Sequence, residues 1–108
     1  MVKLKQDRSE ALDDLFRAVL ALENREECDL FFHDLFTVQE LISFAQRFQV
    51  ARLLFQGNTY QTIQRQMTIS SGTISRINTK FCYGSGGYQL ILSRLDKQPP
   101  RKAAPAGK

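Results

Sequence analysis

Residues 57–78, which read GNTYQTIQRQMTISSGTISRIN, constrain the fold of this chain more than any other segment. Thr59 can cap a first short helix. Ile63 and Met67, four positions apart, would give that helix one apolar face. A short turn beginning at Thr68 would then reverse the chain. A short helix followed at once by a turn predicts the first half of a helix-turn-helix.

The second half begins at Ser70 or Ser71, either of which can cap the next helix, and Ile74 with Ile77 would form its inner face. The remaining positions would face outward: Ser71, Gly72, Thr73, Ser75 and Arg76. Short hydroxyl side chains can reach phosphates or base edges, and an arginine can contact guanine through two hydrogen bonds. We therefore predict that these residues, together with Lys80 one turn further on, bind the major groove of double-stranded DNA.

Two positions differ from the usual helix-turn-helix pattern. Gln64 stands where the two helices touch and a small residue is common. Thr68 stands in the turn where a glycine often supplies a positive φ, which a β-branched residue adopts only at a cost. Two interpretations stay open: a DNA-binding unit, which the pattern favours, and a plain pair of helices in an all-α core.

The composition is that of a globular protein. The chain has 108 residues, of which 43% are hydrophobic and 24% charged, and this suits one domain. It contains no apolar run long enough to span a membrane and its N-terminus lacks a signal-peptide pattern, so we expect a cytoplasmic protein without membrane contact. Cys28 and Cys82 are far apart, and we expect reduced core cysteines.

The charge is distributed unevenly along the chain. Residues 1–36 hold 5 Lys and Arg against 9 Asp and Glu, whereas residues 37–95 hold 6 against 1 and residues 96–108 hold 4 against 1. The basic charge therefore accompanies the helix-turn-helix pattern, as expected for a protein with one end facing a polyanion. The acidic first third can equally be a solvated helix surface.

Three helices are expected before the helix-turn-helix. Residues 9–22 form an amphipathic stripe, and a short aromatic helix follows around residues 28–36. Thr37 and Glu40 make a capping box for a third helix that ends before Gly57. This third helix is apolar nearly all round, and so short a chain cannot cover it. We therefore predict a homodimer in which it packs against a second copy.

The C-terminal part predicts one more helix and a tail. A glycine-rich loop, residues 83–87, precedes a helix over residues 88–95, while residues 96–108 carry proline and charge without apolar periodicity and should be a disordered basic tail. We expect a connection between helices, with positive φ at the glycines of this loop. Without any strand pattern, residues 1–95 are predicted to form a single all-α domain.

The segments FTVQELISFAQRFQVARLLFQG, TYQTIQRQMTISSGTISRIN and YGSGGY resemble the Trp-repressor superfamily, and within it the YerC/YecD-type Trp-repressor-like proteins. The similarity covers about residues 9–95, and YGSGGY is its most specific part. The resemblance implies about six helices in an intertwined homodimer. Two helix-turn-helix heads would then meet successive major grooves, so the protein would regulate transcription at a palindromic site, as a repressor.

The resemblance also implies an effector pocket at Thr37, Arg47 and Arg76, the positions that match the tryptophan site of Trp repressor. Ile77 and Asn78 replace the glycine and serine found there, and the motif is one residue shorter. We therefore expect no response to tryptophan, while a small carboxylate effector is compatible with two arginines. Arg47 could equally serve a structural role, paired with an acid or reaching to solvent.

Nothing in the sequence indicates catalysis, a metal or a cofactor. There is no nucleophile–base pair, and the lone His33 has no partner ligands, so a satisfied surface or core role is expected. Tyr83 and Tyr88 could contact DNA or close the core. One alternative function stays open: a dimeric helical interaction module that uses the helix-turn-helix face to bind another protein.

Overall fold

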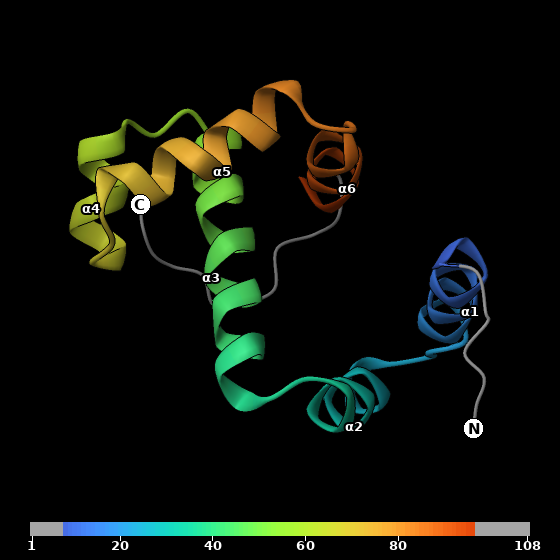
Figure 1. Ribbon diagram of the computed structural model, residues 1–108. Coiled ribbons are helices and arrows are strands. Elements are labelled where there is room, and N and C mark those ends of the chain that lie inside the picture. The colour runs from blue at the N-terminus through green and yellow to red at the C-terminus, as the bar shows by residue number, and fades with distance from the viewer. Residues whose placement is uncertain (1–7, 97–108) are drawn as a thin grey trace. The chain divides into compact units, whose positions relative to one another are not determined.

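The structure, a computed structural model, describes residues 8–96 and consists of helices joined by short connections (Figure 1). No strand occurs in this range, so the prediction of an all-α fold is confirmed. The predicted disordered tail lies outside the described residues, apart from Asp96. The helices in chain order are α1 (Arg8–Leu20), α2 (Arg25–Leu35), α3 (Val38–Phe55), α4 (Tyr60–Met67), α5 (Ser71–Tyr83) and α6 (Gly87–Asp96).

The chain divides into two compact units, residues 1–41 and residues 42–108. The boundary falls within the first turns of α3, so this helix contributes its start to one unit and its remainder to the other. The prediction of a single domain over residues 1–95 stays a prediction.

The first unit is built from local interactions. Asn24 caps α2, because its side chain accepts a hydrogen bond from the backbone N–H of Glu27 at 2.9 Å. On α2, Phe32 packs edge-on against Phe36 with ring centroids 5.7 Å apart. Neither α1 nor α2 contains a buried residue. Several of their large apolar side chains, among them Leu12, Phe16, Leu20 and Leu30, are at least half exposed.

The predicted capping box of α3 is confirmed. The Thr37 N–H donates to Glu40 Oε1 at 2.9 Å, and the Glu40 N–H donates to Thr37 Oγ1 at 3.0 Å. At the other end, Gly57 adopts φ 90° and its N–H bonds to the Leu54 carbonyl at 3.0 Å. A glycine takes this left-handed conformation without a Cβ penalty, so the chain leaves α3 where the sequence predicts.

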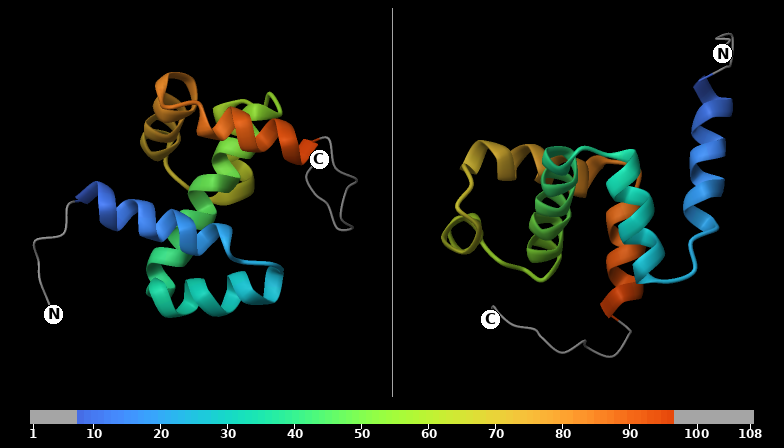
Figure 2. Two further views of the ribbon diagram at one scale, coloured as in Figure 1. Left: turned by 90° about the vertical axis from the view of Figure 1, so that its right-hand side faces the viewer. Right: turned by 90° about the horizontal axis from the view of Figure 1, so that it is seen from below.

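The second unit holds the core. In Figures 1 and 2, α5 crosses α3 near its C-terminal end, with α4 on one side and α6 on the other. Val50, Ile63, Ile74 and Leu92 are completely buried, one from each of these four helices. The core is completed by Ala51, Leu53 and Ile77. This packing holds the helix-turn-helix, α4 and α5, against the C-terminal part of α3.

The prediction of reduced cysteines in the core holds only in part. Cys28 and Cys82 are free thiols, which agrees with the prediction of reduced cysteines. Cys28 is half-buried on α2, which contains no buried residue, and Cys82 is exposed, so the assignment of the two cysteines to the core is wrong. Cys82 lies on the outer side of α5, where its thiol contacts Asn78 Oδ1 at 3.6 Å.

Candidate nucleic-acid interface

The first helix of the motif and its turn form as predicted. Thr59 caps α4 by accepting a hydrogen bond from the Thr62 N–H at 3.1 Å, and Ile63 points into the core with no exposed surface. Gln64 is half-buried, and none of the buried side-chain polar atoms of the described residues lacks a hydrogen-bond partner. Thr68 adopts φ 54° and ψ 56° and is the one described non-glycine residue with positive φ. The turn therefore stores backbone strain at the position where the sequence indicated it.

The N-terminus of α5 is fixed by Ser70. Its hydroxyl accepts a hydrogen bond from the Thr73 N–H at 3.1 Å, so Ser70 is the cap and Ser71 is the first helical residue. Ile74 has no exposed surface and Ile77 is 8% exposed, which confirms both as the inner face. The opposite face of the helix is thereby turned to solvent.

The residues predicted to bind DNA are almost all accessible. Thr73 is half-buried, and the exposed ones are Ser71, Gly72, Ser75, Arg76 and Lys80. Thr73 Oγ1 lies 3.0 Å from Ser70 Oγ and accepts a hydrogen bond from Arg76 Nη2 at 3.3 Å. Three side chains at the start of α5 are thus bonded to one another, which restricts the rotamers of Thr73 and Arg76 on the accessible side of the helix.

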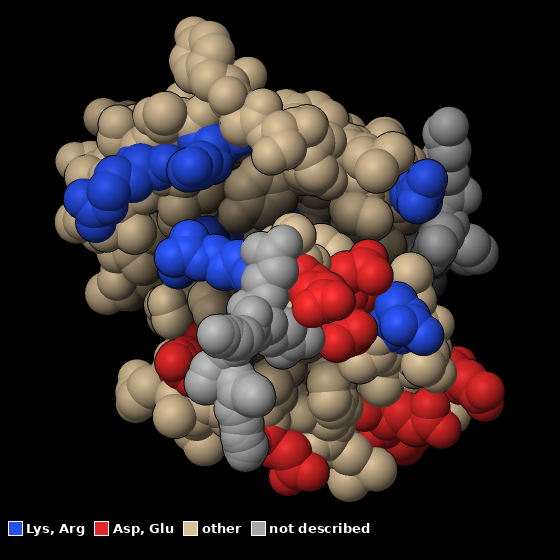
Figure 3. All heavy atoms as spheres, turned by 45° about the vertical axis from the view of Figure 1, so that its right-hand side comes forward, with Lys and Arg blue, Asp and Glu red and all other residues tan. Residues whose placement is uncertain are grey.

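The electrostatics of the second unit favour a polyanion. Within its described range, residues 42–96, Asp96 is the sole acidic residue. Basic side chains on the molecular surface can be followed in Figure 3. Those of the second unit are Arg47, Arg52, Arg65, Arg76, Lys80 and Arg94. Such an excess of cations attracts phosphate groups without regard to base sequence.

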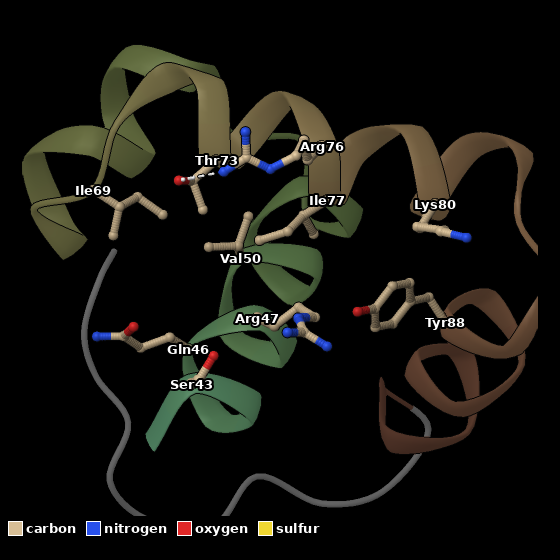
Figure 4. Close-up of a pocket in the computed structure, with 10 residues that line it drawn as sticks. All are labelled: Ser43, Gln46, Arg47, Val50, Ile69, Thr73, Arg76, Ile77, Lys80 and Tyr88. Atoms are coloured by element: carbon tan, nitrogen blue, oxygen red, sulfur yellow. Dashed lines mark hydrogen bonds between the residues drawn. The ribbon is translucent and has the colours of Figure 1, made fainter. Parts of the chain in front are cut away.

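Beneath α5 lies a cleft of about 430 Å³. Figure 4 shows Arg47 rising from α3 and Tyr88 reaching in from α6, with the Tyr88 hydroxyl directed toward the Arg47 guanidinium. The lining residues are Ser43, Gln46, Arg47, Val50, Ile69, Thr73, Arg76, Ile77, Lys80 and Tyr88. The structure therefore brings together two residues of the predicted effector pocket, Arg47 and Arg76.

The third predicted pocket residue, Thr37, does not line this cleft. Its hydroxyl accepts the Glu40 N–H in the capping box of α3. Ile77 lines the cleft but does not close it, because it also packs into the core. Arg47 has the Phe44 ring 5.2 Å from its guanidinium carbon and lies exposed at the cleft wall, so a ligand can reach it.

Sequence reasoning missed several cleft residues. Lys80 was assigned to DNA alone, yet it lines the cleft four positions after Arg76, a spacing that places two residues on one helix face. Tyr88 packs against Phe81 with ring centroids 6.4 Å apart and also lines the cleft. No local pattern marks this, because it depends on how α6 docks. Tyr83 is 85% exposed.

Residues 8–96 contain few clustered metal-ligating side chains. These residues contain no group of three His, Cys, Asp or Glu side chains that could hold a metal ion. His33 lies exposed on α2, with Nδ1 2.8 Å from the Asp29 carbonyl oxygen. None of the described helices is both long and apolar enough to cross a membrane.

The chain is similar to known proteins over most of its length. The chain is 44% identical over 88 residues to the uncharacterized protein YerC of Bacillus subtilis (strain 168), covering 82% of this chain and 85% of that protein. A crystal structure of a Trp-repressor-like protein from Staphylococcus aureus superposes with a TM-score of 0.76 at 48% identity, covering 83% of this chain and 90% of that one.

A TrpR-like protein from Eubacterium eligens ATCC 27750 superposes with a TM-score of 0.79 at 36% identity, covering 86% of this chain and 96% of that one. The Trp repressor protein family, whose model matches residues 10–96, comprises dimeric helix-turn-helix regulators that bind DNA and are not enzymes. The match and the six-helix fold confirm the resemblance inferred from the sequence, and this chain belongs to the Trp repressor family.

Proposed function

We propose that this protein is a sequence-specific transcriptional regulator, a repressor, that reads a palindromic DNA site as a homodimer and does not depend on tryptophan. The observation that carries the proposal is the geometry of α5. Ile74 and Ile77 anchor the helix in the core, while Ser71, Ser75 and Arg76 face solvent at its first turns. In a helix-turn-helix protein, the recognition helix contacts base edges with its N-terminal residues, and the exposed residues of α5 lie at that end.

The homodimer is supported by apolar surface that the single chain leaves uncovered. On α1, Leu12 is 50% and Phe16 54% exposed, and Val38 at the start of α3 is 62% exposed. Helices of this length are marginal without tertiary packing, and α1 and α2 bury no residue. A second copy of the chain would supply the cover, and dimers are the form in which this family acts.

A small anionic effector is the natural ligand of the cleft, because Arg47 and Arg76 both line it. Tryptophan is not expected to be this effector, because the Ile77 side chain takes up space in the cleft where the tryptophan-responsive relative has glycine. The regulator would then hold its DNA-binding orientation at rest, unless another ligand shifts it.

Selection of binding sites from random duplexes, followed by affinity measurement at several salt concentrations, tests the proposal. The expected result is a two-fold symmetric site with half-sites about one helical turn apart. Affinity should fall steeply as salt rises, because phosphates are neutralised on binding. Recovery of no preferred sequence, with a protein partner bound at salt concentrations that abolish DNA binding, would instead identify an interaction module.

A further inference from the structure

We infer that the cleft beneath α5 binds a small dianion without an ammonium group, and that this ligand weakens DNA binding. The binding of a dianion is inferred from the cleft alone. Its effect on DNA binding rests on the proposed function. It differs from tryptophan-type control in both ligand class and direction.

The first step is the charge of the cleft. Arg47 enters from α3, and Arg76 and Lys80 enter from α5, while the lining contains no Asp or Glu. No ion pair within the described residues involves any of the three, since the two ion pairs there lie on α1 and α2. Three unneutralised cations around about 430 Å³ repel one another, and an anion placed between them relieves this repulsion.

The second step concerns the neutral lining. Ser43, Gln46 and the Tyr88 hydroxyl can donate hydrogen bonds to an anion, while Val50 and Ile77 offer a short apolar wall. Nothing in the lining carries the negative charge that an ammonium group needs. A zwitterionic amino acid would place its ammonium among three cations, whereas a dianion on a short carbon or phosphate skeleton would not.

The third step is that two of the cations belong to both sites. Arg76 and Lys80 line the cleft and also lie exposed on the helix proposed to contact DNA. In Figure 4, Arg76 turns back along α5 toward Thr73, to which Nη2 donates at 3.3 Å. An anion that draws Arg76 and Lys80 into the cleft removes them from the phosphates. Ligand and DNA therefore oppose each other, and by linkage each weakens the other equally.

The test uses the full chain at slightly alkaline pH, with inorganic phosphate and glutarate as dianionic probes and L-tryptophan as the zwitterionic comparison. Calorimetry without DNA should show binding of at least one probe and not of tryptophan. Arg47→Gln should weaken that binding at least tenfold. Arg94→Gln, which removes an equal charge from α6 outside the cleft, should change it less than twofold.

The second arm measures DNA affinity with the binding probe at saturation, with ionic strength matched by sodium chloride. We expect affinity to fall at least fivefold. The salt slope of the dimer should fall by about four, because two cations are withdrawn in each protomer. Failure of both probes to bind, equal losses in the two arginine variants, or tighter DNA binding would each overturn the inference. Absence of sequence-specific DNA binding without any probe would refute the proposed function instead, leaving the calorimetric result to decide the ligand class.

Discussion

Arg76 and Thr73 are bonded to each other at the start of α5, with Arg76 Nη2 donating to Thr73 Oγ1 at 3.3 Å. The same hydroxyl lies 3.0 Å from the oxygen of the cap, Ser70. Two side chains proposed to meet DNA are thus held on the helix surface before DNA arrives. Such pre-ordering reduces the side-chain entropy lost on binding.

Replacing Thr73 by valine keeps the shape of the side chain and removes its hydroxyl. We expect the preference for a selected site over a single mismatch to fall by about 1 kcal/mol, because a mismatched base pair typically costs 1–3 kcal/mol. Binding competition between the selected and mismatched duplexes measures this.

Removal of residues 97–108, which hold four Lys and Arg and no acid, should weaken all sequences alike. If neither change alters affinity for the selected site, Thr73 and the tail are not part of the interface.

Thr68 provides a stability prediction. Its φ of 54° lies in the left-handed region, which costs a residue with a Cβ about 1–2 kcal/mol. Thr68→Gly should therefore raise the free energy of unfolding by about 0.5–1 kcal/mol, after the greater flexibility of the unfolded chain is subtracted. Denaturant unfolding at a fixed protein concentration measures it.

Thr79→Gly serves as the matched control for that experiment. Thr79 lies inside α5 with helical neighbours on both sides, so the same substitution should lower the free energy of unfolding by about 0.5–1 kcal/mol. Opposite signs at the two positions would show that backbone conformation, not the loss of a threonine side chain, determines the effect. A loss at Thr68 comparable to that at Thr79 would contradict the prediction.

Much of the fold follows from local sequence. Both ends of α3 were predicted, because a capping box and a glycine are short-range signals. The strained turn at Thr68 was predicted because a glycine often supplies positive φ at this position of a helix-turn-helix. Positive φ was also predicted at the glycines of the glycine-rich loop; this is confirmed at Gly86, which adopts φ 91°, and wrong at Gly84, which adopts φ −83°. Helix α1 ends at Leu20, two residues before the apolar stripe does, because the stripe marks a face and not a terminus.

The site was less predictable, because it depends on docking between distant segments. Lys80 and Tyr88 share the cleft with Arg47 since α5 and α6 both pack on α3, and no spacing in the sequence contains that information. The bond between Thr73 and Arg76 is a choice of rotamer made by neighbouring side chains. Ile77 was expected to stand where the tryptophan-responsive relative has glycine, and it divides its surface between the cleft and the core.

The homodimer is tested at Phe16, which is 54% exposed on α1. If this ring is buried by a second copy, Phe16→Glu places a carboxylate in an apolar interface and should weaken dimerisation at least a hundredfold. Sedimentation equilibrium over a range of concentrations measures the dissociation constant. Arg17→Glu introduces the same carboxylate at the next position, where the side chain is exposed beside Asp14, and should have little effect. Equal behaviour of the two variants would exclude α1 from the interface.

The last prediction is that tryptophan does not tighten DNA binding. Ile77 is 8% exposed and lines the cleft, so an indole could enter that part only by overpacking, at a cost of about 1–3 kcal/mol. The ammonium of the amino acid would also meet the charges of Arg47 and Lys80. Calorimetry with millimolar tryptophan should give no binding heat with the parent protein, and DNA affinity should stay unchanged.

Ile77→Ala enlarges the cleft without the helix-breaking effect of glycine, and should bind tryptophan more tightly than the parent. Since this substitution also removes core packing worth about 2–5 kcal/mol, circular dichroism must first show that the variant is folded, and Ile77→Val provides a milder version. Micromolar affinity of the parent for tryptophan, with DNA affinity rising alongside, would show that the cleft adapts around Ile77 and that tryptophan control is retained.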